Sequence, residues 1–358
     1  RWAMQKFGKD YPDTEQVINS CFANASSHAK QGGGGESRGD SKTATVEEIK
    51  SFLDGHISLR FNEITSRVEY EIPADNTDAH RFMPVNDRIV NSLWSQMSTI
   101  TRVNIQDMYR VIESDYVPVF NPFKAYLNNL CQSVKSVGDR DYIQEFAQTV
   151  RVKGGEQEQM LWHLYLKKWL VGMVASWISD DVVNNVILVL IGEQGAYKTT
   201  WFNYLLPPPL KQYFYTKTNA NRMSKDDILT LAQYALVCCE ELDTMRPAEL
   251  NQLKAAVTMP SIDERAAYAH YHEHRKHIAS FCGTGNNTQF LSDPTGNRRW
   301  LPFEVESIVS PRDHPFHYEG IYSQALALYK SGFQYWFTKE EIQELNRHNR
   351  QFETPHLE

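Results

Sequence analysis

The sequence V-I-L-V-L-I-G-E-Q-G-A-Y-K-T-T-W spans Val186–Trp201 and decides the fold. Its first six residues are apolar and mix β-branched residues with leucine, which predicts a short strand buried on both faces. The remainder approximates the phosphate-loop pattern of Gly, four residues, Gly, Lys and then Ser or Thr. Gly192, Lys198 and Thr199 are in register, whereas Tyr197 replaces the second glycine. Gly195, two residues earlier, could supply the conformational freedom of the loop instead.

The chemistry of this pattern indicates which residues would contact a nucleotide. Successive backbone N–H groups before a helix point at a phosphate, and the helix dipole favours its negative charge. The lysine reaches the outer phosphates, and the hydroxyl after it coordinates magnesium. We therefore expect ATP and Mg²⁺ as cofactors. The nucleotide-binding residues are predicted to be Gly192, Glu193, Gln194, Gly195, Ala196, Tyr197, Lys198, Thr199 and Thr200. The alternative is an ordinary strand–turn–helix with a chance lysine.

A second apolar stretch ends in carboxylates, as a nucleotide hydrolase requires. Residues 234–239 predict another buried strand, and Glu240 and Glu241 follow it directly. The carboxyl ends of parallel strands face one crevice, so both acids are expected opposite the phosphate loop. Glu240 and Thr199 would hold the metal, and Glu241 would activate water. The alternative is an acidic helix cap after a core strand.

Two further motifs supply polar and cationic groups. A third predicted strand, residues 277–282, leads to Asn286, whose amide could position the attacking water or sense the γ-phosphate. A Gly/Asn turn is the alternative there. Arg298 and Arg299 follow a turn, and an arginine can stabilise charge on a transferring phosphoryl group, in cis or from a neighbouring subunit. A salt-bridged surface pair would look the same.

Residues 263–277 are locally basic and aromatic in a chain of net charge −7. We interpret them as a β-hairpin with its tip near residues 272–274. Basic side chains could contact a phosphate backbone, and tyrosines could stack on bases. The candidate DNA contacts are Arg265, Tyr268, Tyr271, His272, His274, Arg275 and Lys276. The histidine spacing suits a strand, and no thiol or clear carboxylate set completes a metal site. A solvated hairpin without a partner is the alternative.

Taken in order, these motifs resemble the virulence-associated protein E family of phage and mobile-element ATPases, and most closely its Bacteroidetes branch. The motifs are Gly192–Thr200, Glu240–Asp243, Leu253-Lys254, Gly283–Asn286 and Thr295–Trp300, within a resemblance that covers roughly residues 45–350. It implies an α/β fold: a superfamily 3 helicase-like, AAA+-type ATPase core with flanking helices, preceded by a mostly helical domain. It also implies a ring-former in DNA replication.

Carried over by position, the resemblance assigns roles to individual residues. Lys198 and Thr199 become the phosphate-loop pair, Glu240 and Glu241 the acidic pair, and Asn286 the first sensor. The arginine-finger candidates are Arg298 and Arg299, and the hairpin takes the place of a DNA-contacting pre-sensor hairpin. Tyr197 departs from the glycine of the wider group.

Composition and the position of glycine-rich segments predict the domain organisation of the 358 residues. Four glycines in a polar run, residues 32–35, indicate a flexible linker. The chain starts without methionine in sequence typical of mid-helix, so we expect a piece of a longer protein. The expected units are the end of an upstream, primase-linked module (1–30), the linker (31–44), a mostly helical region (45–180), the ATPase core (181–310) and a helical C-terminal region (311–358).

The same features bound the partners and the class of function. Five cysteines without CxxC pairs and no apolar run of membrane-spanning length indicate a cytoplasmic protein with no membrane partner. The favoured function is a helicase-like ATPase that acts on single-stranded or forked DNA as a homo-oligomeric ring, such as a hexamer. The alternative is a nucleotide-dependent assembly switch or scaffold that does not unwind DNA. A nucleotide kinase shares the loop, but paired acids, a sensor asparagine and adjacent arginines fit it less well.

Overall fold

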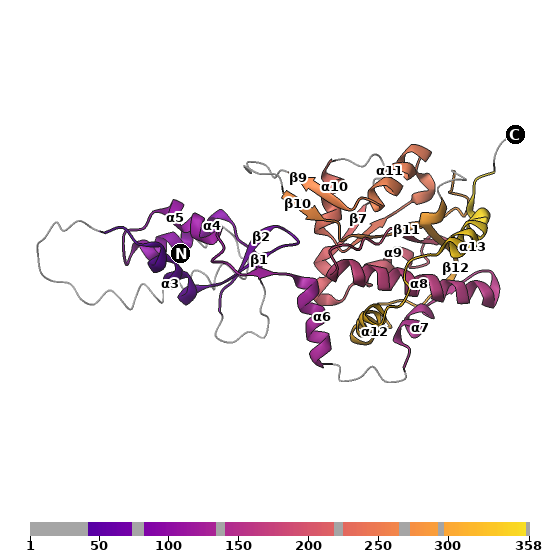
Figure 1. Cartoon of the computed structure of the whole chain (residues 1–358), viewed down its shortest axis with the longest axis horizontal. Coiled ribbons are helices and arrows are strands. Elements are labelled where there is room, and N and C mark those ends of the chain that lie inside the picture. Colours follow the sequence, from indigo (N-terminus) through magenta and orange to yellow (C-terminus); the bar gives the residue numbers. More distant parts are fainter. Residues whose placement is uncertain are drawn as a thin grey trace, which may run out of the picture.

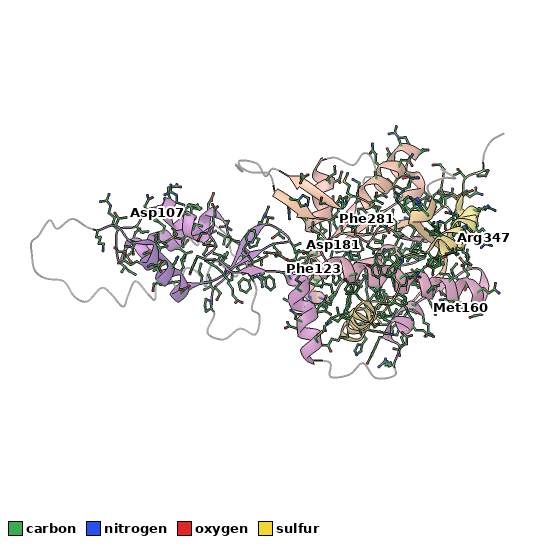
Figure 2. The ribbon with its side chains drawn as sticks, in the orientation of Figure 1. Asp107, Phe123, Met160, Asp181, Phe281 and Arg347 are labelled. Carbon is green, nitrogen blue, oxygen red and sulfur yellow. The ribbon has the colours of Figure 1, made fainter. Side chains whose placement is uncertain are left out.

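The computed structural model describes residues 42–73, 82–133, 140–217, 225–264, 273–292 and 297–355. Figure 1 shows two lobes, a smaller one drawn in indigo and purple and a larger one that holds the rest of the described chain. Figure 2 places Asp107 on the smaller lobe, Phe281 within the larger lobe and Phe123 where the two meet. Among the segments interpreted from the sequence, residues 1–41 and the hairpin residues 265–272 lie outside the described residues.

The smaller lobe combines three helices with a four-stranded sheet of order β3-β2-β1-β4. Its elements are α3 (Val46–His56), β1 (Ser58–Asn62), β2 (Arg67–Glu71), β3 (Met83–Pro84), α4 (Asp87–Ser98), α5 (Ile105–Ile112) and β4 (Val119–Phe120). Thr45 caps the start of α3, because its hydroxyl accepts a hydrogen bond from the Glu48 backbone N–H. Strands β1 and β2 pair antiparallel and form a hairpin that turns at residues 63–66.

The larger lobe is built on a six-stranded sheet of order β5-β12-β6-β11-β8-β7, parallel except for β5. Its strands are β5 (Val150–Val152), β6 (Ile187–Ile191), β7 (Phe214–Lys217), β8 (Leu236–Cys239), β11 (Ser280–Gly285) and β12 (Trp300–Ile308). The hairpin strands β9 (Ser261–Glu264) and β10 (Glu273–Lys276) form a separate two-stranded sheet. The predicted mainly parallel sheet is therefore confirmed.

Helices cover both faces of the central sheet. They are α6 (Pro122–Ser133), α7 (Tyr142–Ala147), α8 (Gly155–Ile178), α9 (Lys198–Asn203), α10 (Lys225–Gln233), α11 (Pro247–Val257), α12 (Tyr318–Lys330) and α13 (Lys339–Asn349), with 3₁₀ turns η1 (Pro208–Tyr213), η2 (Leu242–Thr244), η3 (Asn297–Arg299) and η4 (Arg350–Phe352). Because both faces are covered, strand β6 is buried on both sides. Leu188 and Leu190 enter the core on one face, and Ile187, Val189 and Ile191 enter the core on the other. A strand buried on both sides needs the unbroken apolar run that opened the sequence.

Helix α8 differs from its predicted character. The spacing of residues 159–178 indicates an amphipathic helix, but from Lys168 to Trp177 every side chain of α8 is buried. The reason is that α8 contacts the sheet, α7 and α12 and is enclosed by them. Even Lys168 is enclosed, and its Nζ donates to the carbonyls of Gln334 and Trp336 at 2.9 and 3.0 Å.

The structure shifts two expected domain boundaries and divides one expected unit. Ala44, assigned to the linker, is buried in the smaller lobe, and its N–H donates to the Arg102 carbonyl at 2.7 Å. Residues 45–180 are not one mostly helical unit, because the chain up to Phe120 has a core of its own and a small sheet. Strand β5 and helix α8 belong to the sheet lobe instead. None of the described helices is long and apolar enough to cross a membrane.

Candidate nucleotide site

The loop between β6 and α9 has two residues with a left-handed backbone. Gly195 has φ 86°, and Tyr197 has φ 59° and ψ 16° directly before the helix begins at Lys198. A left-handed conformation is the reason the phosphate-loop pattern favours glycine before the lysine. Tyr197 therefore adopts a glycine-like conformation at a cost, while its ring remains 46% exposed.

Lys198 points back into the loop that precedes it. Its Nζ donates to the carbonyls of Gly192 and Glu193, both at 2.6 Å, and lies 3.5 Å from Oδ1 of Asn286. Burial lowers the pKa of Lys198, and the negative charge of Asp243 opposes that shift. The ammonium group is thus held among oxygen atoms at the carboxyl edge of the sheet, where two predicted site residues meet.

The two predicted acids lie at the same edge. Strand β8 ends at Cys239, and the next two residues are Glu240, half-buried, and Glu241, exposed and left-handed with φ 54°. They face the phosphate loop across a cleft of about 370 Å³. The cleft is lined by Gln194, Gly195, Ala196, Tyr197, Lys198, Thr199, Thr200, Glu240, Glu241, Thr284 and Asn286. The structure therefore brings together the predicted loop, acids and sensor asparagine.

Strand β11 explains this convergence, because it lies between the strand of the loop and the strand of the acids. Cys282 pairs with Leu188 of β6 on one side and with Cys238 of β8 on the other. Asn286 follows β11 directly and is exposed at the cleft. The strand begins at Ser280, three residues later than predicted, and the preceding His277 bonds through its ring to the carbonyls of Met259 and Ala279.

Two residues that carried no predicted role also shape the site. Thr284 lines the cleft from β11. Asp243 accepts from the Asn287 N–H at 3.0 Å through Oδ2, while its buried Oδ1 has no hydrogen-bond partner among the described atoms. A Cβ on Gly285 would lie 2.8 Å from that Oδ1. The sequence shows Asp243 three residues after Glu240, and it shows the glycines of β11. Only the structure reveals that Asp243 contacts one of these glycines.

The two arginines lie at the opposite edge of the sheet from this cleft. Parallel pairing places Trp300, the residue after Arg299, beside Ile187, whereas Glu304 is beside Ile191 next to the loop. Four residue steps separate Trp300 from Glu304, about 13 Å at 3.3 Å per residue. That distance exceeds the length of an arginine side chain. Arg298 and Arg299 are therefore not placed to reach the cleft of their own chain.

The hairpin prediction is confirmed in part and corrected in part. Strands β9 and β10 pair antiparallel, but Glu273–Lys276 is strand, so the tip does not lie at residues 272–274. His274 is exposed on β10, with Nδ1 2.8 Å from Oδ1 of Asp263. The predicted contacts Arg265, Tyr268, Tyr271 and His272 lie outside the described residues.

Arg275 and Lys276 do not face outward as a phosphate-binding pair. Arg275 is buried, and its Nη2 donates to the carbonyl of Ile64 in the smaller lobe. Lys276 donates to the carbonyls of Ser176, at 2.6 Å, and Ser179 at the end of α8. A cation that satisfies the last carbonyls of a helix is a structural cap. Both cations are therefore engaged by carbonyls of their own chain, and their contact with DNA stays a prediction.

Three comparisons with known proteins add to this geometry. Residues 133–354 match the model of the virulence-associated protein E-like domain, which is more than half of the chain. A solved structure titled as the A-form apo structure of the NrS-1 C-terminal region is 15% identical, with a TM-score of 0.43 over 85% of this chain and 66% of that one. A second apo structure of that region is 14% identical, with a TM-score of 0.46 over 85% of this chain and 67% of that one. This chain thus spans about two thirds of their length. No curated protein matches significantly.

Proposed function

Because the chain belongs to the virulence-associated protein E-like family, we propose that it is a P-loop ATPase with a helicase-like role in DNA replication of a phage or mobile element. The observation that carries the proposal is the shared cleft. Lys198, Glu240, Glu241 and Asn286 converge there from the ends of three neighbouring parallel strands. A lysine, paired acids and an amide at one crevice are the groups that phosphoryl transfer from ATP to water requires.

The residues of the cleft fit Mg²⁺. The Thr199 hydroxyl and the Glu240 carboxylate both line it, and magnesium prefers such oxygen ligands. When bound, Mg²⁺ neutralises charge on the phosphate oxygens. The chain itself does the rest: Lys198 binds the outer phosphates, Glu241 accepts a proton from the attacking water, and Asn286 orients that water.

The position of the arginines supports a site shared between copies of the chain. Arg298 and Arg299 lie at the far edge of the sheet from their own cleft, so an arginine that completes the site must come from a neighbour. A closed homo-oligomeric ring, such as a hexamer, would supply one arginine turn to every cleft. We propose that single-stranded or forked DNA is the polymer on which this ring acts.

ATP hydrolysis with and without single-stranded DNA tests the proposal. We expect Lys198→Ala to weaken ATP binding, and Glu241→Gln to bind ATP but lose the water-activating base. Removing a general base typically lowers the rate by about 10²–10⁴-fold. Lys211→Ala is the matched control, because Lys211 is an exposed lysine outside the cleft. An unchanged hydrolysis rate in both cleft variants would exclude this function.

A nucleotide-dependent switch is the second candidate, and two observations favour it. Tyr197 holds a costly conformation in the loop, and Arg275 and Lys276 are engaged by carbonyls of their own chain. In that case ATP would drive assembly without unwinding. Molecular size measured with and without ATP and single-stranded DNA, followed by a strand-displacement assay, separates the two. Assembly on ATP without displacement, even with upstream sequence restored, supports the switch.

A further inference from the structure

The turn that carries the two arginines is fixed at both ends by one buried side chain. Asn349, at the end of α13, is fully buried, and its Nδ2 donates to the carbonyls of Asn297 and Trp300 at 2.8 and 2.9 Å. Those two carbonyls bracket Arg298 and Arg299 in the sequence. A single amide therefore sets the conformation of the turn.

The residues around Asn349 reinforce this attachment. The side chain of Asn297, itself only 3% exposed, donates to Oε1 of Glu353 at 2.8 Å. On the other side, His348 holds the amide of Asn349: its Nδ1 lies 3.1 Å from Oδ1 of Asn349, and its Nε2 lies 2.5 Å from Oε1 of Glu158 on α8. The turn is thus tied through α13 to the buried helix of the lobe.

A backbone pairing completes the connection. The N–H groups of Phe290 and Leu291 both donate to the Phe352 carbonyl, at 3.1 and 3.0 Å, and the Thr354 N–H donates to Leu291 at 2.8 Å. Residues 348–354 therefore join two segments, the chain that follows β11 and the arginine turn that leads into β12, and these two strands flank β6. We call residues 348–354 the C-terminal clamp.

Neither arginine has a partner within the part of the chain that the structure describes. Among the residues that the structure describes, no acid forms an ion pair with Arg298 or Arg299, and neither guanidinium makes a hydrogen bond. Arg299 is half-buried, and burial together with the charge of Arg298 lowers its pKa. Two adjacent cations on a fixed turn, without an ion-pair partner among the described residues, suit an anion that arrives from outside.

We propose that the C-terminal clamp is a positioning device that presents Arg298 and Arg299 to the terminal phosphate of a nucleotide bound by a second copy of this chain. The inference rests on the proposed ATPase function and adds the part of the chain that aims the arginines. Asn349 and Asn297 are positioning residues, since they act through the turn. Preorganisation matters because a misplacement of about 1 Å can lower a rate about 10²-fold.

Two variants separate aiming from folding. Asn349→Ala removes both bonds to the turn, and Glu353→Ala removes the bond to Asn297 from a half-buried position that folding tolerates more easily. We expect both to lower kcat for ATP, by about 10²-fold for Asn349→Ala. The affinity of each variant for ATP in its own cleft stays unchanged, because the cleft lies at the other edge of the sheet. Asn91→Ala, on an exposed face of α4, is the control.

Mixed assemblies provide a readout that a folding defect cannot imitate. Asn349→Ala copies keep an intact cleft, and Lys198→Ala copies keep an intact clamp and arginine turn. Mixing the two should restore hydrolysis above the sum of the separate samples, because the cleft of one copy meets the arginines of the other. The reference mixture is Lys198→Ala with the double variant Arg298→Ala/Arg299→Ala.

The outcomes distinguish the clamp from the shared site. If the reference mixture regains activity but the Asn349→Ala mixture does not, the clamp is refuted and the shared site stands. Wild-type kcat in both Asn349→Ala and Glu353→Ala also refutes the clamp. If the reference mixture gains nothing, the site shared between copies is refuted, and the clamp with it.

Discussion

Replacing Tyr197 by glycine and, in parallel, by alanine measures the strain in the phosphate loop. The two variants differ by one Cβ. At an ordinary backbone conformation, alanine stabilises a folded protein over glycine by about 0.5–1 kcal/mol, because glycine has more freedom to lose. Tyr197 has φ 59° and ψ 16°, where an L-residue costs about 1–2 kcal/mol. The difference predicts that the glycine variant is the more stable by about 0.5–1 kcal/mol, a reversal of the usual order.

Urea unfolding followed by far-ultraviolet circular dichroism gives the stability difference, and an ATP titration gives the functional consequence. Because the ring of Tyr197 is 46% exposed, both variants lose similar packing, and their comparison isolates the backbone. We expect Tyr197→Gly to bind ATP as well as the wild type or better. An alanine variant at least as stable as the glycine variant would refute the strain. Loss of ATP binding in Tyr197→Gly would instead make the ring part of the nucleotide site.

Two further predictions concern the supports of the site. A Cβ on Gly283 would lie 2.3 Å from Cδ1 of Leu242, so Gly283→Ala should displace the turn at Leu242 that follows the two acids, and should lower ATP hydrolysis. The control is Gly55→Ala, because Gly55 faces open space on α3. This control should raise the unfolding free energy by about 0.5–1 kcal/mol. Equal activity in both would contradict the packing argument. Burial lowers the pKa of His277 in the folded protein. As the pH falls below about 6.5, the unfolded chain therefore takes up the proton before the folded chain does. The free energy of unfolding then decreases by at most about 1.4 kcal/mol per pH unit, until the pH reaches the lowered pKa of the folded state. Urea unfolding at pH 7.5 and 5.5 should show that His277→Gln loses less unfolding free energy at the lower pH than the wild type does. An identical loss in both proteins would exclude His277 as a source of the pH dependence.

The convergence of the loop, the acids and Asn286 on one cleft could be predicted because its signals are local. The apolar run before Gly192 has the pattern of a strand buried on both faces, and the acids after residues 234–239 follow a run of the same kind. Parallel strands end at one edge, so the sequence alone predicts that loop, acids and Asn286 meet there. The 370 Å³ cleft brings these groups together in the structure. Their roles in hydrolysis remain predictions until the variants are measured.

The basic hairpin shows where composition misleads. Arg275 and Lys276 have the charge of phosphate-binding residues, and no local pattern distinguishes a cation in solvent from one that caps carbonyls elsewhere. Their partners, Ile64 and the end of α8, lie about 100 or more residues away in the sequence. Only packing of the hairpin against the smaller lobe and α8 decides that both side chains are used within the chain.

The sequence by itself determined which runs are buried, where the loop begins, and which polar residues follow each strand. Those properties depend on hydrophobic periodicity and on chain direction, and both are written in consecutive residues. The tertiary structure alone decided that Tyr197 is left-handed, that Asp243 sits against Gly285, and that the arginine turn lies at the opposite edge of the sheet from its own cleft, bonded at both ends to Asn349. These depend on contacts between segments far apart in the chain, and such contacts leave no local pattern.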